Sequence, residues 1–263
     1  LPRGGVPAGS VADDPLISSV VRRAHEATRV WLDQPVGHCA QPLFSHLAPL
    51  GLDPAALCVA EAQRWFMARA LHDHPARDLP LLSAMAPFKL GGRGGPTHYT
   101  DIAPGPITLR DLADLYVYPN RLMAVQVTGA GLRDWLEHAA GLFAQVTPGS
   151  RDTQLLDGAL PHHDFDVIAG VTWRIDLSAP ARFAPSGAVL DPGGPGRIRD
   201  LCWQGRAVEK DAVFLVATNN YRACGGGHFP GLTGDSVVLD TGVPVPQVLR
   251  RYFEAHPDGP PVQ

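Results

Sequence analysis

The sequence predicts an α+β fold in which helices flank a mixed sheet. Helical patterns and short apolar strands follow one another without the regular alternation of a doubly wound sheet. The pattern is mainly helical up to His72, whereas short strands dominate from Leu81 onward. No internal repeat is evident, and the 263 residues are enough to bury one large core or two small ones.

Three helix patterns follow a short N-terminal stretch. Residues 1–12 are rich in Gly and Pro and are expected to form a flexible tail or linker, which leaves 13–263 as one domain. A helix is expected over 13–33, because an Asp-Pro pair starts it and apolar residues recur at helical spacing. Further helices are expected over 41–50 and, with another Asp-Pro start, over 53–72.

Shorter elements follow. The expected strands are 81–84, 122–127, 167–177, 198–203 and 213–218, and the expected helices are 108–116, 129–139 and 245–253. The Pro- and Gly-rich stretch 179–196 is expected to be a loop between two of the strands.

The composition argues against a nucleic-acid polymer as a partner and against a membrane-spanning segment. Hydrophobic residues make up 45% and charged residues 18% of the chain, as in an ordinary globular protein. A net charge of -4 gives no electrostatic basis for binding a nucleic-acid polymer. No apolar run approaches the roughly twenty residues that span a bilayer. The chain starts at Leu1 without a basic or apolar leader, as expected for a mature secreted protein or a part of a longer one.

The four cysteines give no metal motif. Cys39, Cys58, Cys202 and Cys224 are irregularly spaced and include no CxxC pair, which argues against a zinc knuckle. Their even number permits disulfides without requiring them.

The stretch VFLVATNNYRACGGGHFPG (213–231) carries the strongest binding signal. A buried strand ends in polar residues that include Asn220, and Tyr221 and a glycine triplet that starts Gly225-Gly226 follow it. Glycines let backbone approach a ligand closely, and an aromatic ring beside amide groups suits a flat polar ligand such as a nucleobase. The alternative is a tight turn after a core strand, with Tyr221 packed against it.

A second glycine-rich loop, Gly91-Gly92-Arg93-Gly94-Gly95, follows another short strand. It lacks the Gly-Lys-Ser/Thr ending of a Walker A loop and does not open a helix as GxGxxG does. The guanidinium of Arg93 matches phosphate or ribose oxygens. The alternative is a glycine turn with a surface arginine.

The segment YVYPN (116–120) precedes the predicted strand 122–127. The amide of Asn120 offers both a donor and an acceptor, as recognition of a purine edge requires. Tyr118 provides an aromatic ring beside it. The alternative is aromatic packing under a turn.

No catalytic centre is predicted. His162, His163, Asp164 and Asp166 suggest a metal site, but adjacent histidines on an extended chain point to opposite faces, so we interpret this segment as a solvated turn. The chain contains no GxSxG elbow and no HExxH pair.

Taken together, these stretches resemble the C-terminal, nucleoside-binding domain of the 5'-nucleotidase family. The resemblance is greatest to the bacterial periplasmic 2',3'-cyclic-nucleotide 2'-phosphodiesterase/3'-nucleotidase branch. It keeps the family order and covers most of residues 20–231. The matching segments are AHEATRVWLDQPVG (24–37), LPLLSAMAPFKLGGRGG (79–95), YTDIAPGPITLRDLADLYVYPNRLMAVQVTGAGLRDWLEHAAG (99–141), FDVIAGVTWRIDLSAPARF (165–183) and TNNYRACGGGHFPG (218–231).

The resemblance implies a two-domain hydrolase whose N-terminal domain holds a dinuclear metal centre. No cofactor is then expected in this chain, and divalent metals are expected in that N-terminal domain. It further implies that Tyr118 and Tyr221 sandwich the nucleobase and that Asn120 reads its edge. Arg93 and the Gly91–Gly92 backbone would meet ribose or phosphate, with the other polar and glycine residues of the 213–231 stretch beside them.

Two details distinguish this chain within the family. Tyrosine at both stacking positions supports the cyclic-phosphodiesterase branch, because the 5'-nucleotidases proper use Phe at both. Many members carry an Asp after the final glycines that holds ribose hydroxyls, whereas this chain has Gly227, His228 and Phe229 there.

The expected function is therefore that of a substrate-binding domain, inactive alone, of a periplasmic or extracellular nucleotide hydrolase. Its ligands would be nucleosides, 3'-nucleotides or 2',3'-cyclic nucleotides, and its partner the metallophosphoesterase domain of the same polypeptide. One alternative is a free-standing, non-catalytic module that binds or senses nucleosides. Another is an interaction domain whose aromatic pair is buried core.

Overall fold

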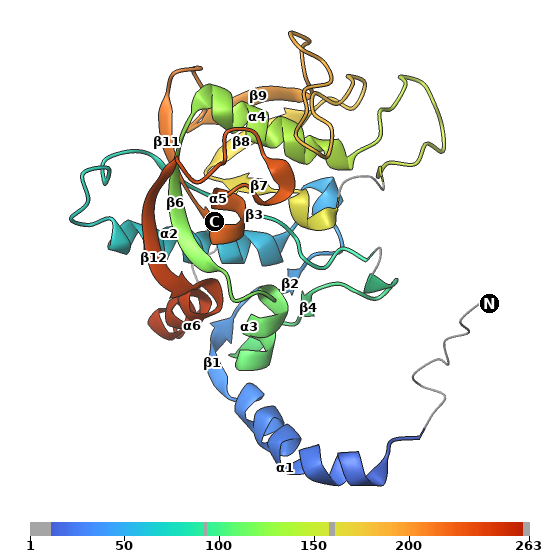
Figure 1. The fold of residues 1–263 in the computed structure, drawn as a ribbon, viewed down its shortest axis with the longest axis vertical. Helices are drawn as coiled ribbons and strands as arrows, with labels where there is room; N and C mark the ends of the chain where they lie inside the picture. Colours follow the sequence, from blue (N-terminus) through green and yellow to red (C-terminus); the bar gives the residue numbers. More distant parts are fainter. Residues whose placement is uncertain (1–11, 92–93, 158–160, 260–263) are drawn as a thin grey trace.

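A five-stranded mixed sheet runs through the centre of the molecule (Figure 1). The computed structural model describes residues 12–91, 94–157 and 161–259. The order across the sheet is β12 (Val237–Pro244), β6 (Arg121–Thr128), β11 (Val213–Asn219), β3 (Leu81–Met85) and β7 (Val167–Ala169). Strands β11 and β3 are parallel, and every other neighbouring pair in this sheet is antiparallel. The α+β prediction is confirmed.

Strand β6 shows why the sheet is buried on both faces. Leu122 and Ala124 belong to one hydrophobic cluster, while Met123, Val125 and Val127 belong to another. Side chains alternate along a strand, so a run of consecutive apolar residues supplies both clusters at once.

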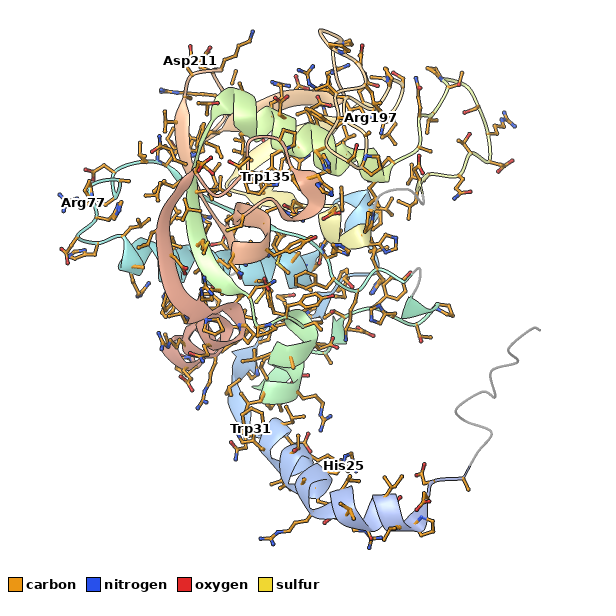
Figure 2. The ribbon with its side chains drawn as sticks, viewed as in Figure 1. His25, Trp31, Arg77, Trp135, Arg197 and Asp211 are labelled. Atoms are coloured by element: carbon orange, nitrogen blue, oxygen red, sulfur yellow. The ribbon has the colours of Figure 1, made fainter. Side chains whose placement is uncertain are left out.

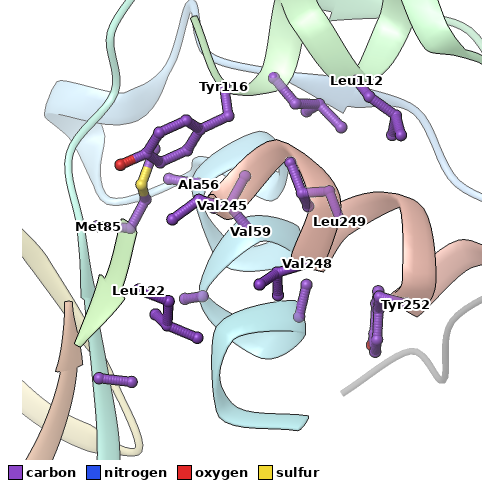
Figure 3. Close-up of a cluster of buried hydrophobic side chains, with 14 of the residues drawn as sticks. Ala56, Val59, Met85, Leu112, Tyr116, Leu122, Val245, Val248, Leu249 and Tyr252 are labelled. Carbon is purple, nitrogen blue, oxygen red and sulfur yellow. The ribbon is translucent and has the colours of Figure 1, made fainter. Parts of the chain in front are cut away.

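Three helices cover the first face: α2 (Pro54–Ala70), α3 (Leu109–Leu115) and α6 (Val245–Ala255). Figure 3 shows Val59 of α2 and Leu249 of α6 among the side chains that meet there. Helix α2 starts where expected because the Asp53 carboxylate accepts the N–H of Ala56. Helix α3 starts with a capping box between Thr108 and Asp111.

The second face is covered by α4 (Gly129–Ala139) and a three-stranded antiparallel sheet. That sheet consists of β8 (Val171–Ile175), β9 (Ile198–Trp203) and β10 (Arg206–Ala207). Trp135 of α4 is almost fully buried on this side of the molecule (Figure 2). Its indole N–H donates to the carboxylate of Asp166, and the carboxylate of Glu137 accepts the backbone N–H of Arg197. Both contacts are buried and join α4 to other parts of the chain.

The expected helix over 41–50 is wrong. The chain instead forms a short strand, β2 (Leu43–Phe44), which pairs with β4 (Asp101–Ile102), and then a single 3-10 turn, η2 (Ala48–Leu50). Two prolines in this stretch lack the N–H that a helix interior needs, so a continuous helix is disfavoured.

The expected strand over 167–177 is divided in two. Gly170 has a φ of +100°, which non-glycine residues rarely adopt, and a Cβ there would lie 2.8 Å from Leu82 Cδ2. The glycine lets the chain leave the central sheet after β7 and enter the three-stranded sheet as β8. One apolar run therefore serves two sheets.

Helix α1 (Pro15–Leu32) confirms the expected first helix, and none of its residues is buried. It extends away from the sheet (Figure 1) and is followed by β1 (Pro35–Cys39), which pairs with β5 (Gly105–Thr108). Of the predicted tail, only residue 12 lies within the described residues, so the domain boundary stays a prediction. Within the described ranges, no helix combines the length and hydropathy that crossing a bilayer requires.

Candidate functional site

Four chain segments meet at one edge of the central sheet. Strand β11 is antiparallel to β6, so Asn219 at its end pairs with Leu122 at the start of β6. Strand β3 is parallel to β11 and therefore ends at the same edge, where Met85 pairs with Val167 at the start of β7. Residues just after β3 and β11 and just before β6 and β7 are thus brought together.

A cavity of about 260 Å³ lies at this edge. Tyr118 and Asn120 reach it from the segment before β6, and Tyr221 from α5 (Asn220–Ala223), the short helix after β11. The rings of Tyr118 and Tyr221 are about half exposed, at 49% and 47%. The remaining lining residues are Ala84, Met85, Ala86, Phe88, His163, Asp166, Thr218, Asn219 and Arg222.

An aromatic row supports Tyr118 from behind. The Phe88 ring stands edge-on to Tyr118 at 5.3 Å and to Tyr116 at 5.0 Å between centroids. Burial raises the pKa of the Tyr116 hydroxyl to about 12, although the side-chain amides of Asn120 and Asn219 oppose this rise. Tyr116 therefore stays protonated at neutral pH and packs beneath the site, as Figure 3 shows beside Met85.

Asn220 has a different contact from the one expected. Its Oδ1 accepts the backbone N–H of Arg121 at 2.8 Å, which fastens α5 to the first residue of β6. Asn220 is not among the described residues that line the cavity. The neighbouring Asn219 caps α5 by accepting the N–H of Arg222. Both amides thus hold the segment that carries Tyr221.

The glycines shape the loops around the cavity. A Cβ on Gly226 would lie 2.5 Å from Cδ1 of Tyr221, so the tyrosine ring rests directly on the backbone at this glycine. Gly225 has a φ of +98°, a conformation that favours glycine. Gly91 is buried, and a Cβ there would lie 2.7 Å from the Tyr99 hydroxyl. None of these three lines the cavity among the described residues.

Gly92 and Arg93 lie outside the described residues. Their expected contact with ribose or phosphate therefore stays a prediction.

The interpretation of 162–166 as a solvated turn is wrong. Asp164 and Asp166 are 5% and 4% exposed, and both form ion pairs with the buried guanidinium of Arg222. The Asp166 carboxylate also accepts the indole N–H of Trp135 at 2.7 Å. The signal that could have revealed this burial is the placement of Asp166 between Phe165 and an apolar strand.

The lining suits a flat, uncharged ring system with polar edges. Aromatic and small apolar residues lie beside amides, a hydroxyl and an imidazole. The Asp166 and Arg222 charges are paired with each other and are therefore not available as a free acid or base. The described part of the chain contains no group of three His, Cys, Asp or Glu residues that could hold a metal ion.

His138 lies buried beside this ionic cluster. It is 1% exposed, its ring centroid is 4.4 Å from that of Phe229, and neither ring nitrogen has a hydrogen-bond partner among the described residues. Burial lowers its pKa below the usual value; Asp164 opposes this change and Arg222 adds to it.

Protonation of His138 is therefore expected to destabilise the fold. The unfolded chain binds a proton near pH 6.5 and the native state does so only at lower pH, so the free energy of unfolding should fall as the pH drops below about 6.5. The loss attributable to this residue is at most about 1.4 kcal/mol per pH unit. Urea denaturation of the protein and of His138→Phe at several pH values measures it.

The variant should lose less stability between pH 7 and 5 than the parent protein. Any packing cost of the phenylalanine is the same at every pH, so only the slope matters. Asp53, whose pKa burial raises to about 6, contributes a change of opposite sign equally to both proteins. Identical slopes would show that His138 does not control the acid sensitivity.

The chain belongs to the family of 5'-nucleotidase C-terminal domains, whose sequence model matches residues 59–234. It is 40% identical over 247 residues to a 2',3'-cyclic-nucleotide 2'-phosphodiesterase/3'-nucleotidase of Haemophilus influenzae, covering 92% of this chain and 37% of that protein. It is 38% identical over 248 residues to a trifunctional nucleotide phosphoesterase protein of Bacillus subtilis, covering 94% and 17%. The resemblance recognised in the sequence is confirmed.

Solved structures show the same fold. A putative 5'-nucleotidase from Staphylococcus aureus superposes with a TM-score of 0.66 at 20% identity, covering 94% of this chain and 42% of that one. A 5'-nucleotidase precursor from Thermus thermophilus gives 0.62 at 16% identity, covering 95% and 42%. The chain thus spans less than half the length of each protein to which it is similar here.

Proposed function

We propose that this domain binds the nucleoside part of 3'-nucleotides and 2',3'-cyclic nucleotides, with the base stacked between Tyr118 and Tyr221. The observation that carries the proposal is the placement of two half-exposed tyrosines, from segments about a hundred residues apart, around one cavity. The names of the relatives, which are nucleotide phosphoesterases, supply the substrate class.

The size and chemistry of the cavity favour a single base. Its volume of about 260 Å³ is just below the range of about 300–1,000 Å³ that drug-sized ligands occupy. Stacking on an aromatic ring contributes roughly 1–3 kcal/mol per base and tolerates every base. Asn120, which lines the cavity, supplies a donor and an acceptor for a base edge. A cavity of this kind can accept any base on its stacking faces.

Hydrolysis is assigned to another part of the polypeptide. The relatives are far longer than this chain, and the proposed enzyme carries its metal centre in an N-terminal metallophosphoesterase domain. Gly92 and Arg93 remain proposed contacts of ribose or phosphate. The proposed place of action is the periplasm or the extracellular space. Binding energy gained here accelerates the reaction only when the reacting group is delivered to the catalytic centre.

Calorimetric titration of this chain with adenosine, 3'-AMP and ribose tests the binding proposal. Adenosine and 3'-AMP should bind at millimolar concentration or below, and ribose should not, because it lacks a base to stack. Absence of heat and of amide shifts with adenosine would contradict the proposal and favour an interaction domain. Turnover of 2',3'-cyclic AMP by this chain after chelation and repurification would contradict the assignment of hydrolysis to another domain.

A further inference from the structure

Arg222, the residue after Tyr221, has no hydrogen-bonding capacity left for a ligand. Its side chain is buried, with 3% of the residue exposed. A guanidinium has five N–H groups, and all five are bonded within the protein. Nε and Nη2 donate to the two oxygens of Asp166, Nη1 donates to Asp164 and to the carbonyl of Gly226, and Nη2 also donates to the carbonyl of His163.

These bonds join two consecutive segments to a third that is distant in sequence. Arg222 lies on α5, Asp164 belongs to η5 (His162–Asp164), and Gly226 starts the next 3-10 turn, η6 (Gly226–His228). The Asp166 carboxylate also accepts the indole N–H of Trp135, which links these segments to α4. The guanidinium carbon also lies 3.9 Å from the ring centroid of Phe229 and 5.8 Å from that of Tyr221.

The glycine loop fits between this ionic cluster and the Tyr221 ring. A Cβ on Gly227 would lie 2.1 Å from Nη1 of Arg222 and 2.3 Å from Oδ1 of Asp164. On the next residue back, a Cβ on Gly226 would meet the ring of Tyr221 at 2.5 Å. The backbone that supports the ring is therefore the same backbone whose carbonyl Arg222 holds.

We propose that Arg222 is a positioning residue that holds the ring of Tyr221 in the orientation needed to stack on a nucleobase. The inference rests on the proposed function. Arg222 acts indirectly, through the loop and its own approach to the Tyr221 ring, because none of its N–H groups is free to bond a base or sugar. Dispersion falls steeply with small increases in distance, so a ring that is free to shift stacks less well. Fixing it in advance removes part of the entropy cost of binding.

The test is adenosine affinity of Arg222→Lys, measured at a temperature where circular dichroism shows the variant to be folded. Lysine keeps the charge but cannot reproduce the fork of five donors. The expected result is roughly a tenfold loss of affinity, corresponding to about 1.4 kcal/mol. The milder Asp164→Asn removes one carboxylate of the cluster and should weaken binding in the same direction, which keeps the test valid if the lysine variant does not fold.

Arg197→Lys is the matched control. Arg197 is 2% exposed and its guanidinium donates to the carbonyls of Ala179, Ala140 and Phe143, none of which lines the cavity. This variant should lower the free energy of unfolding and leave adenosine affinity unchanged. Equal losses of affinity in both arginine variants would mean that Arg222 contributes only to general stability.

A double-mutant cycle identifies the route of the effect. In a Tyr221→Ala background, Arg222→Lys should cause no further loss of adenosine affinity, because the ring that it positions is gone. A further tenfold loss in that background would overturn the inference. If Tyr221→Ala alone leaves affinity unchanged, the proposed function fails; if it weakens binding and Arg222→Lys does not, only the positioning role fails.

Discussion

Replacing Tyr221 by alanine is expected to weaken adenosine binding by roughly 5- to 150-fold, which corresponds to about 1–3 kcal/mol of lost stacking. Tyr118→Ala should produce a loss of similar size. The physical reason is that each half-exposed ring would cover one face of a flat ligand in the cavity that both line. Calorimetry with adenosine measures the change directly.

Conservative and neighbouring variants separate stacking from other effects. Tyr221→Phe keeps the ring and should bind adenosine nearly as well as the parent protein. Val117→Ala removes an exposed side chain beside Tyr118 that does not line the cavity, and should leave the affinity unchanged. If the alanine variants of both tyrosines bind adenosine like the parent protein, the base does not stack on them.

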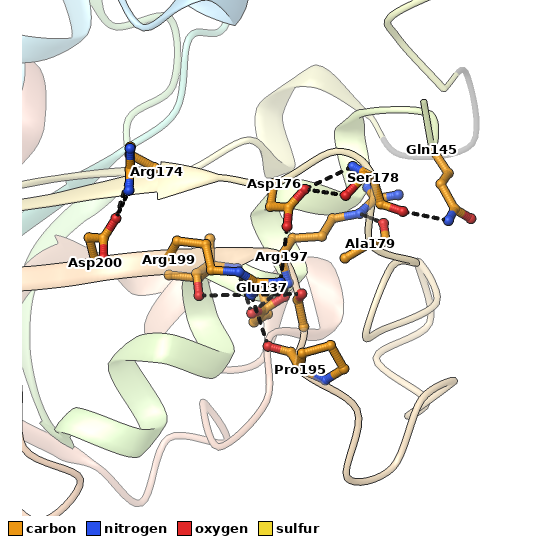
Figure 4. Close-up of polar contacts among 12 residues, drawn as sticks. Glu137, Gln145, Arg174, Asp176, Ser178, Ala179, Pro195, Arg197, Arg199 and Asp200 are labelled. Atoms are coloured by element: carbon orange, nitrogen blue, oxygen red, sulfur yellow. Dashed lines mark hydrogen bonds and ion pairs between the residues drawn. The ribbon is translucent and has the colours of Figure 1, made fainter. Parts of the chain in front are cut away.

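Replacing Glu137 by alanine is expected to lower the free energy of unfolding by roughly 2–6 kcal/mol, at about 1–3 kcal/mol for each of the two buried backbone N–H groups that would lose their acceptor. The Glu137 carboxylate is 1% exposed and accepts the backbone N–H groups of Arg197 and Ile198 at 2.7–2.9 Å (Figure 4). A Cβ on Gly196 would lie 2.2 Å from Glu137 Oε1, which shows how tightly the carboxylate is enclosed.

The same variant removes a negative charge that stabilises the buried guanidinium of Arg197. Burial lowers the pKa of Arg197, and Glu137 is the first of the groups that oppose this change. The guanidinium closes the end of α4 by binding the carbonyls of Ala140 and Phe143, where cations are favoured by the helix dipole. Loss of Glu137 therefore affects both the start of β9 and the end of α4.

Guanidinium chloride denaturation measures this loss, and Glu254→Ala is the control. Glu254 pairs with Arg250 on the exposed face of α6, where an ion pair contributes about 0.3–0.5 kcal/mol. A loss below about 1 kcal/mol for Glu137→Ala would contradict the account of this buried contact.

The helices and strands that the sequence predicted correctly are those with a complete local signal. Strand β11 is a run of apolar residues that ends in polar ones, and α4 has an N-cap at Thr128 followed by apolar residues at helical spacing. The meeting of Tyr118 and Tyr221 at one edge then follows from the antiparallel pairing of β6 and β11. Strand β12 was missed because Gly242 and Pro244 interrupt its pattern and its pairing is irregular.

The buried charges could not be predicted because their burial depends on partners far away in the sequence. Asp166 and Arg222 are 56 residues apart and are brought together only when β7 and β11 join the same sheet. Seen alone, each is a polar residue of the kind usually found at the surface. The same reason explains the missed role of Asn220, whose partner Arg121 is 99 residues away.

A crystal structure of this chain soaked with adenosine is the most direct test of base stacking on Tyr118 and Tyr221. The adenine ring is expected to lie between the rings of Tyr118 and Tyr221, with ring atoms about 3.5–4.0 Å apart on each face, and with Asn120 at the base edge. Adenine bound elsewhere on the molecule, or held by neither tyrosine at the occupied site, would contradict this expectation.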